Sequence, residues 1–267
     1  MHASAGAASA KVELRDVGLR YFGFEGETEA LKGVSLSIAP GEFVAIIGQS
    51  GCGKSTLLSL IAGILKPTEG VILVDGLPVN GPSRKVGYML QQDYLFEWRT
   101  ILDNAVLGAE IQGANMQAAR SRAAALLTRY GLGQFLNHLP RQLSGGMRQR
   151  AALARTLCTE PDVVLLDEPF SALDSQTRIA LADEVAQILR RERKTAILVT
   201  HDIGEAVSMA ERVIVLSRRP GQVKSDHPIR FMTAEGRRPT PFAARGAPEF
   251  NGYFNTLWQE LEVHVEG

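Results

Sequence analysis

The sequence has few cysteines and aromatic residues, no long apolar run and no excess of charge of either sign. Its 267 residues include 2 cysteines and 6% aromatics, and 29 Lys and Arg balance 29 Asp and Glu. Two cysteines cannot build a disulfide framework, and no apolar run approaches the roughly 20 residues that span a bilayer. A net charge of zero gives no general attraction to nucleic acid or anionic lipid, so we expect no nucleic-acid partner.

The most informative segment fits the nucleotide-phosphate pattern G-x-x-x-x-G-K-[ST]. It consists of Gly48, Gln49, Ser50, Gly51, Cys52, Gly53, Lys54, Ser55 and Thr56. An apolar run at 43–47 predicts a buried strand before it, and 57–62 predicts a helix after it. The glycines let successive N–H groups point at an anion, and the helix start adds its dipole. Lys54 would bind the β- and γ-phosphates and Ser55 would bind Mg²⁺; the alternative is a glycine-rich turn with an incidental lysine.

Two features bear on the compartment. A disulfide at Cys52 would block the phosphate loop, which favours a reducing compartment; we interpret this cysteine as a small loop residue rather than an activated thiol. Residues 1–10 are rich in Ala and Ser but have neither a basic start nor a continuous apolar segment. We expect them to form a disordered tail on a soluble protein made in the cytoplasm, which another chain would have to hold at any membrane.

Strand patterns come first along the chain, and helices then interrupt them. Alternating apolar residues predict a strand over 34–38, and the run 71–74 predicts another. The region 93–158, rich in Ala, Arg and Leu, predicts an all-helical insertion. One of its helices would cover 118–130 and end at Gly131.

The last part of the chain returns to strands. Buried strands are predicted at 163–166, 195–200 and 213–216, with a helix over 174–193 between the first two. Strands that alternate with helices predict βαβ units and a parallel sheet. The pattern fades after the third strand, and 249–265 predicts a terminal helix.

Polar residues follow two of these strands. Asp167 and Glu168 come after the first, at the edge where open α/β sheets bind ligands. Asp167 would hold Mg²⁺, and Glu168 would polarise a water that attacks the γ-phosphate; the alternative is a solvated strand end. His201 follows the second strand and could contact the γ-phosphate or organise the water, although a lone histidine is more often structural.

The segment 143–150, which reads LSGGMRQR, is a second candidate anion site. Ser144 can cap the following helix, and Gly145 and Gly146 allow close backbone approach; the alternative is an ordinary helix start. One apolar helix face is predicted from Met147, Ala151, Ala154 and Leu157. Two anion-binding helix starts with one Mg²⁺ carboxylate cannot easily serve one nucleotide in one subunit, so a dimer in which each copy completes the other's site would resolve the conflict.

Taken together, these residues resemble those of the ATP-binding subunits of ABC transporters. The similarity covers about residues 11–217 and includes, in order, the phosphate loop, the signature at 143–150, the Walker B run at 163–168, the D-loop at 171–174 and the switch histidine His201. It implies an α/β fold of the P-loop NTPase class, with a RecA-like parallel sheet core, an N-terminal antiparallel β subdomain and an α-helical subdomain inserted at about 93–158. The ATP-binding domain would span 11–242, and 243–267 would be a C-terminal extension.

The resemblance also implies roles for residues outside these motifs. Tyr21 would stack on adenine, with Phe22 and Phe24 as alternatives, and Gln91, next to Gln92, would contact Mg²⁺ and the attacking water. The cofactors would be ATP and Mg²⁺. In a homodimer, the signature of one copy would bind the nucleotide of the other.

The resemblance extends to partners. The segment 91–100 would contact an integral-membrane permease at the cytoplasmic face of the inner cell membrane, and an extracytoplasmic solute-binding protein would take part indirectly. Details at 41–48, 81–83 and 98–100 are similar to nitrate/sulfonate/taurine-type importer ATPases. The segment 88–92 departs from the Val-Phe-Gln common there, so the solute stays open. We expect an ATPase that drives uptake of a small solute.

Three other functions are alternatives. A soluble ABC-type ATPase without a permease would resemble tandem domains or carry long coiled-coil inserts, which this sequence lacks. A GTPase switch would need an Asn-Lys-x-Asp motif, which the sequence does not contain. A non-catalytic nucleotide sensor is disfavoured by the presence of Glu168 and His201.

Overall fold

The structure is a computed structural model and describes residues 10–23, 26–232 and 238–262. The tail predicted for 1–10, apart from Ala10, and the alternative adenine contact Phe24 lie outside the described residues. Within the described part, no helix combines the length and apolar character that crossing a membrane requires.

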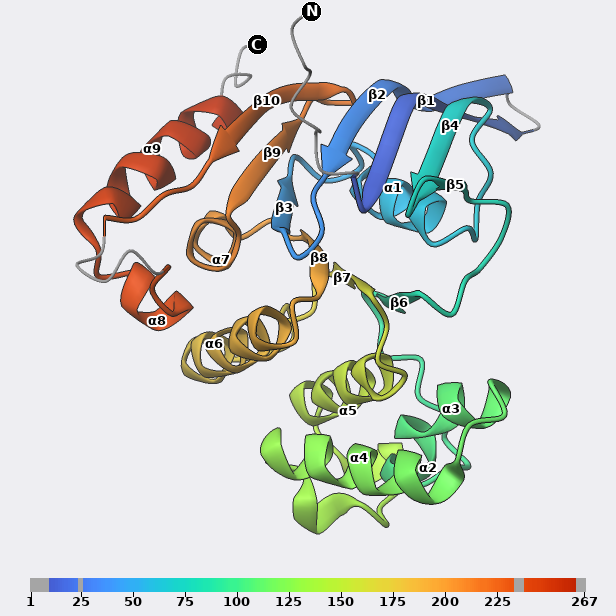
Figure 1. Cartoon of the computed structure of the whole chain (residues 1–267). Coiled ribbons are helices and arrows are strands. Elements are labelled where there is room, and N and C mark those ends of the chain that lie inside the picture. Colours follow the sequence, from blue (N-terminus) through green and yellow to red (C-terminus); the bar gives the residue numbers. More distant parts are fainter. Residues whose placement is uncertain (1–9, 24–25, 233–237, 263–267) are drawn as a thin grey trace, which may run out of the picture.

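The described strands form two sheets (Figure 1). The first is antiparallel, in the order β2-β1-β4-β5, and consists of β1 (Val12–Gly23), β2 (Gly26–Ile38), β4 (Glu69–Val74) and β5 (Leu77–Pro78). The second, in the order β10-β9-β3-β8-β7-β6, consists of β3 (Phe43–Ile47), β6 (Val86–Met89), β7 (Val163–Asp167), β8 (Thr195–Val199), β9 (Arg212–Leu216) and β10 (Val223–Pro228). Neighbours in this second sheet pair in parallel, except β10 with β9. The predicted parallel sheet is therefore confirmed.

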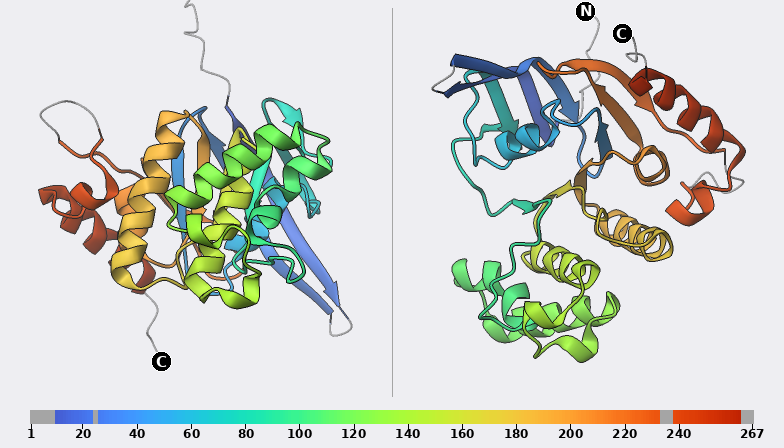
Figure 2. Two further views of the ribbon diagram at one scale, coloured as in Figure 1. Left: turned by 90° about the horizontal axis from the view of Figure 1, so that it is seen from below. Right: turned by 180° about the vertical axis from the view of Figure 1, so that it is seen from behind.

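Helices cover the parallel sheet and form a separate layer below it (Figures 1 and 2). Near the sheets lie α1 (Lys54–Ile61), α6 (Ser175–Arg191), α7 (Ile203–Met209), α8 (Pro241–Ala244) and α9 (Pro248–Glu262). The lower layer contains α2 (Ile101–Ala105), α3 (Leu107–Ile111), α4 (Met116–Arg129) and α5 (Gly145–Cys158), with two 3₁₀ turns, η1 (Gly133–Phe135) and η2 (Pro140–Gln142). The helix predicted over 118–130 is confirmed as α4, and Gly131 follows it with a φ of 73°.

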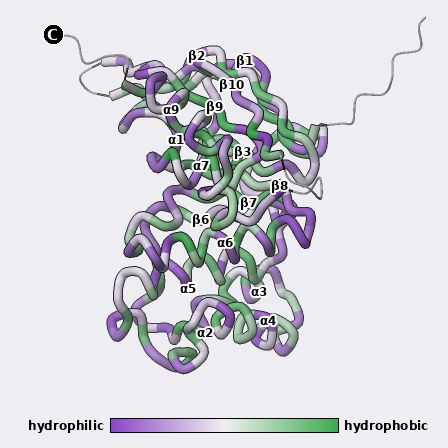
Figure 3. Tube along the Cα trace, turned by 90° about the vertical axis from the view of Figure 1, so that its left-hand side faces the viewer, coloured by the Kyte–Doolittle hydropathy of each residue, from purple (hydrophilic) through white to green (hydrophobic). Residues whose placement is uncertain are grey.

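Side chains of the central strands alternate between two cores. In β3, Phe43, Ala45 and Ile47 belong to the core under the helices, whereas Val44 and Ile46 belong to the core shared with α1 and the antiparallel sheet. The strands β7, β8 and β9 divide in the same way. Because both faces are covered, these strands read as continuous apolar runs, and the middle of the chain trace in Figure 3 is mainly hydrophobic.

The prediction for residues 93–158 needs two corrections. The first eight residues form a loop, and helices begin only after Thr100, whose side chain caps α2. Buried Asn104 holds the loop by accepting from the Phe96 N–H at 2.7 Å and donating to three carbonyls. The helix α5 is also buried on more than the predicted face, since Ala152 and Leu153 are inaccessible too. Because α5 packs between the other helices of its layer and β6, it buries residues on further sides besides the predicted apolar face.

Sequence patterns missed β1 and β10 for different reasons, and they also missed the short strands β5 and β6. In β1, register shifts and the left-handed Asp16, with φ of 51°, interrupt the regular alternation of apolar residues. β10 is an edge strand whose side chains are only half-buried or exposed, so Val223–Pro228 carries no apolar period. The terminal helix predicted over 249–265 is present as α9 up to Glu262, and the division at 242/243 falls inside α8.

A glycine contact between β1 and β4 gives a stability prediction. Gly70 has φ of 76°, and a Cβ there would lie 2.3 Å from the carbonyl oxygen of Asp16, whereas Gly76, with φ of 73°, has open space around the same position. Gly76→Ala should cost about 1–2 kcal/mol through backbone strain alone. Gly70→Ala should cost about 2 kcal/mol more, because the backbone of β1 must move. Urea unfolding of both variants measures the difference, and equal losses would contradict the predicted collision.

Candidate functional site

Residues from several strand ends meet at one edge of the parallel sheet. A cleft of about 480 Å³ lies there and is called the strand-end cleft below. It is lined by Tyr21, Ala30, Ser50, Gly51, Gly53, Lys54, Ser55, Thr56, Gln91, Glu168, His201 and Arg219. Each of the parallel strands β3, β6, β7, β8 and β9 ends next to one of these groups, as parallel topology requires. The cleft thus gathers side chains that are as much as 198 positions apart, from Tyr21 in β1 of the antiparallel sheet to Arg219 after β9 of the parallel sheet.

The predicted phosphate loop follows β3 and leads into α1. Gly51 and Gly53 have φ of 75° and 102°, conformations that glycine adopts without strain. Gly48 touches buried Cys52, because a Cβ on Gly48 would lie 2.7 Å from its Sγ. The buried Lys54 ammonium donates to the carbonyls of Gly48 at 2.8 Å and Gln49 at 3.0 Å, so it lies inside the loop.

The side chain of Gln49 connects the loop to the last helix. Its Nε2 donates to the Leu261 carbonyl of α9 at 3.0 Å, and its Oε1 accepts from Arg218 Nε at 2.7 Å. Gln49 therefore lies behind the loop, toward a neighbouring cavity that it lines with Arg218 and Leu261. It is absent from the described lining of the strand-end cleft.

The carboxyl of Asp167 is suited to a cation. It ends β7, is 3% exposed, and its Oδ1 has no hydrogen-bond partner among the described residues. Burial raises its pKa above the usual value, a nearby Glu168 adds to this, and hydrogen bonds from Ser55 and Tyr88 oppose it. A divalent cation would use the unpartnered oxygen and favour the ionised form. In the described ranges, no group of three or more His, Cys, Asp and Glu side chains is arranged to hold a metal ion, so a metal here would need further oxygens from substrate or water.

The carboxyl of Glu168 lies between two groups from neighbouring strands. Gln91 Nε2 donates to Oε2 at 3.2 Å, and His201 Nδ1 lies 3.3 Å from Oε1. The backbone of Glu168 has φ of 47°, and its carbonyl accepts from Gln149 and Ser171. A left-handed non-glycine residue is strained, and the surrounding hydrogen bonds hold it so that the side chain points into the cleft.

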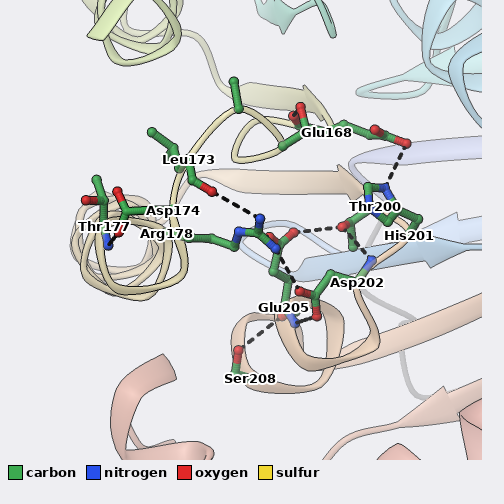
Figure 4. Close-up of polar contacts among 12 residues, drawn as sticks. Glu168, Leu173, Asp174, Thr177, Arg178, Thr200, His201, Asp202, Glu205 and Ser208 are labelled. Atoms are coloured by element: carbon green, nitrogen blue, oxygen red, sulfur yellow. Dashed lines mark hydrogen bonds and ion pairs between the residues drawn. The ribbon is translucent and has the colours of Figure 1, made fainter. Parts of the chain in front are cut away.

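A buried polar network lies behind His201 (Figure 4). Thr200 Oγ1 donates to Glu205 at 2.7 Å, and Asp202 caps α7 by accepting from the Glu205 N–H at 3.0 Å. From α6, Arg178 donates to Asp202 at 3.2 Å and to the carbonyl of Leu173 at 3.1 Å. The network therefore joins the 171–174 loop to the strand end that carries His201.

Tyr21 and Thr56 form the other end of the strand-end cleft. The Tyr21 ring is 43% exposed, and its hydroxyl lies 3.4 Å from Thr56 Oγ1. Phe22, the alternative adenine contact, is 75% exposed, and it is not one of the described residues that line the cleft. An exposed aromatic ring beside a phosphate loop can stack on a base.

The signature residues do not enter the strand-end cleft of the described structure. Ser144 caps α5 through the Met147 N–H at 3.4 Å, and a Cβ on Gly146 would lie 2.7 Å from Leu173 in the 171–174 loop. Gly145 lines a separate cleft of about 450 Å³, together with Gln91 and Ser171. One copy of the chain thus places the phosphate loop and the signature at two different clefts.

The loop 93–100 presents aromatic side chains outward. The rings of Phe96 and Trp98 stack with centroids 4.8 Å apart, and Trp98 is 75% exposed. Leu95 is buried and anchors the loop to the helical layer. An exposed stacked pair beside Gln91 is a candidate contact for another protein.

Sequence reasoning missed three residues at this site. Ala30 lines the cleft but belongs to no sequence motif. Tyr88 donates a hydrogen bond to Asp167 only because β6 lies beside β7. Burial raises the pKa of Tyr88 to about 12, so its hydroxyl stays protonated. The sequence could have indicated Arg219, because it comes three residues after the predicted strand 213–216, whose carboxyl end must lie at the same edge of the parallel sheet.

Comparisons with known proteins agree with this geometry. The profile of the family described as "ABC transporter" matches residues 31–171. The chain is 45% identical to the uncharacterized ABC transporter ATP-binding protein YtlC of Bacillus subtilis, covering 90% of this chain and 92% of that protein. It is 43% identical to the taurine import ATP-binding protein TauB of Yersinia pestis, covering 88% and 94%. A dimeric post-hydrolysis structure of the ATP-binding cassette MJ0796 with ADP and Pi is similar at a TM-score of 0.76 and 36% identity, covering 83% of this chain and 100% of that one. The predicted P-loop NTPase fold of the ABC ATPase type is therefore confirmed.

The buried Glu205 gives a pH-dependent prediction. Burial raises its pKa from 4.5 to about 7, assisted by Asp202 and opposed by Thr200, Arg178 and His201. The folded state then binds this proton more tightly than the unfolded state, so this group's contribution to stability is lost as pH rises from about 4.5 to about 7.

Glu205→Gln should remove this loss, because the amide oxygen still accepts from Thr200 and carries no charge. The stability of the variant relative to wild type should rise by about 2–3 kcal/mol between pH 5 and pH 8. Urea unfolding at each pH measures it, with the exposed Glu97→Gln as control; parallel curves for wild type and Glu205→Gln would contradict the prediction.

Proposed function

The chain belongs to the ABC transporter family as an ATP-binding subunit with ATPase activity, and we propose that it couples ATP binding and hydrolysis to uptake of a small solute through a separate membrane permease. One observation carries the chemical part of this proposal. The strand-end cleft brings the phosphate loop, Glu168, Gln91 and His201 together, and buried Asp167 is hydrogen-bonded to Ser55 of that loop, while the signature lies outside the cleft. The ATP-binding domain would span 11–242 with its helical subdomain at about 93–158, followed by the extension 243–267.

The phosphate end of the cleft would bind the polyphosphate of ATP. Gly51 and Gly53 hold the loop in backbone conformations that glycine adopts without strain, and N–H groups at the start of α1 would contact the phosphate oxygens. Lys54 would turn from the loop carbonyls to the β- and γ-phosphates. Tyr21 would stack on adenine at the other end.

Mg²⁺ would be held by the Ser55 hydroxyl and Asp167, with Gln91 close by, and when bound it neutralises charge on the β- and γ-phosphates. The unpartnered Asp167 Oδ1 and the mainly oxygen donors fit such an ion. The carboxyl of Asp167 would then gain a charged partner, which favours its ionised form. Tyr88 would keep Asp167 oriented through its hydroxyl.

Glu168 would accept a hydrogen bond from the attacking water and polarise it. Its carboxyl is held by Gln91 and His201, which lie 3.2 and 3.3 Å away, so its orientation does not depend on solvent. His201 is 64% exposed at its side chain and would contact the γ-phosphate from the same edge. Positioning and charge, rather than covalent chemistry, provide the catalysis.

Each site would be completed by a second copy. Ser144, Gly145 and Gly146 start α5 on a different surface from the phosphate loop, so a head-to-tail pair could place them over the γ-phosphate of the partner's nucleotide. The dimeric MJ0796 cassette with ADP and Pi supports such a pair. Loss of the γ-phosphate would remove the bridge and favour opening.

The transport role rests on the relatives and on one exposed surface. The taurine import protein supports an importer with a nitrate-, sulfonate- or taurine-like solute. The residues 91–100, with the exposed Phe96–Trp98 pair, would contact the permease at the cytoplasmic face of the membrane. An extracytoplasmic solute-binding protein would take part only through the permease. The alternative is a soluble ABC-type ATPase without a permease.

The catalytic role of Glu168 is tested by Glu168→Gln. The amide keeps the shape but cannot assist the water, so turnover should fall by about 10²–10⁴-fold while ATP still binds. The variant should then accumulate as a dimer with ATP on a sizing column. Glu192→Gln makes the same change at an exposed position after α6 and should behave as wild type. Wild-type phosphate release by Glu168→Gln would refute the assignment.

The permease contact is tested by Trp98→Ala, with Phe242→Ala as a control of similar exposure, 75% against 71%. Each tagged variant is co-expressed with the permease encoded beside it and purified in detergent. Retention of the permease should fall by about tenfold or more for Trp98→Ala alone, because an exposed aromatic at an interface centre often carries much of the binding energy. Equal retention by both variants would favour the alternative of an ATPase that does not use this surface.

A further inference from the structure

The turn between β9 and β10 is built to hold a fixed shape against the phosphate loop. Within the turn, Ser217 N–H donates to the Gln222 carbonyl at 2.9 Å, and Ser217 Oγ donates to the Pro220 carbonyl at 3.1 Å. Gly221 pairs with β2, donating to the Ala30 carbonyl at 2.9 Å. A Cβ on Gly221 would lie 2.1 Å from the Cys52 carbonyl oxygen, so no larger residue fits.

This turn places the side chain of Arg219 in the strand-end cleft. Its Nε donates to the Gly51 carbonyl at 3.3 Å, and its Nη2 lies 3.7 Å from where a Cβ on Gly51 would be. The residue is exposed, unlike Lys54, which is 7% exposed. Arg219 shares the cleft lining with Tyr21, Ala30 and Lys54.

The adjacent arginine has a different position. Arg218 Nε donates to the Gln49 side chain, and Arg218 lines the neighbouring cavity behind the loop. The two arginines therefore contact the phosphate loop from different sides. Arg219 alone of this pair faces the space where the nucleotide would bind.

The charge of the cleft also favours an anion contact at Arg219. Among the described lining residues, Lys54 and Arg219 are the permanent cations, and Glu168 is an acid. A guanidinium presents a planar fork of donors that matches phosphate oxygens, and such charge-assisted hydrogen bonds are stronger than neutral ones. A triphosphate has more oxygens than one ammonium and one helix start can contact.

We propose that Arg219 is a second phosphate-binding cation of the nucleotide site, which contacts the outer oxygens of the polyphosphate from the β9–β10 turn. This deepens the proposed function and rests on it. Arg219 adds to the phosphate loop a contact from the fifth parallel strand, so every parallel strand of the described sheet would contribute to nucleotide binding or hydrolysis.

The test measures binding of ATP, ADP and AMP to the full-length chain by calorimetry with Mg²⁺. Arg219→Ala should weaken ATP and ADP binding by about tenfold, and AMP binding by less than about twofold, because AMP lacks the outer phosphates. Arg219→Lys should recover part of the affinity, since it keeps the charge but loses the fork. The loss caused by Arg219→Ala should shrink as salt rises, because the lost contact is electrostatic.

Lys32→Ala is the matched control. Lys32 is exposed and its N–H donates to the Gly221 carbonyl, so it lies beside the turn without lining the cleft in the described structure. Lys32→Ala removes one positive charge and should leave the affinities for ATP, ADP and AMP within about twofold of wild type, since exposed charges outside the cleft are screened. An equal loss in Lys32→Ala and Arg219→Ala would overturn the proposal in favour of a general charge effect.

Other outcomes separate this proposal from the one it rests on. Wild-type ATP affinity in Arg219→Ala, or an equal loss for ATP, ADP and AMP, would overturn the role of Arg219. Lys54→Ala reports on the site itself and should bind ATP far more weakly than wild type. If Lys54→Ala binds ATP weakly and Arg219→Ala binds it as wild type does, only the proposed role of Arg219 fails. If Lys54→Ala binds ATP as tightly as wild type, the proposed phosphate site fails as well.

Discussion

The constraint on which the rest depends is the burial of one parallel sheet on both faces. With α1 and the antiparallel sheet on one side and helices on the other, the middles of β3, β7, β8 and β9 carry apolar side chains, and the polar groups of these strands lie at their ends. Parallel direction then brings the carboxyl ends to a common edge. Gln91, Glu168 and His201 meet there only because β6, β7 and β8 are neighbours, although 110 positions separate the first from the last.

A partly buried ion pair connects that edge to the rest of the molecule. Arg178 contacts both the Leu173 carbonyl and the Asp202 carboxyl, so the 171–174 loop and the residue next to His201 share one guanidinium. On the other side, Gly146 packs on Leu173. The start of α5, the 171–174 loop and the segment that carries His201 are thus joined by a chain of direct contacts.

The sequence predicted the central strands, α4, α6 and the phosphate loop because these depend on local patterns: apolar runs, helical spacing and glycine positions. It placed Asp167, Glu168 and His201 at one edge by a general rule of parallel topology. It missed β1 because bulges break the alternation, and β10 because an edge strand needs no apolar period. It also missed Arg219 and Tyr88, since their importance comes from strand order, which no single segment encodes.

The bond between the Gln49 amide and the Leu261 carbonyl ties the last described helix to the loop that would hold phosphate. Proteolytic trimming that removes Leu261 would remove the carbonyl acceptor, and the Gln49 amide would then donate its hydrogen bond to water. Material that has lost its final residues during storage could therefore differ in nucleotide affinity from fresh material, while its far-UV spectrum stays nearly the same. Intact mass is accordingly worth measuring before affinities from separate preparations are compared.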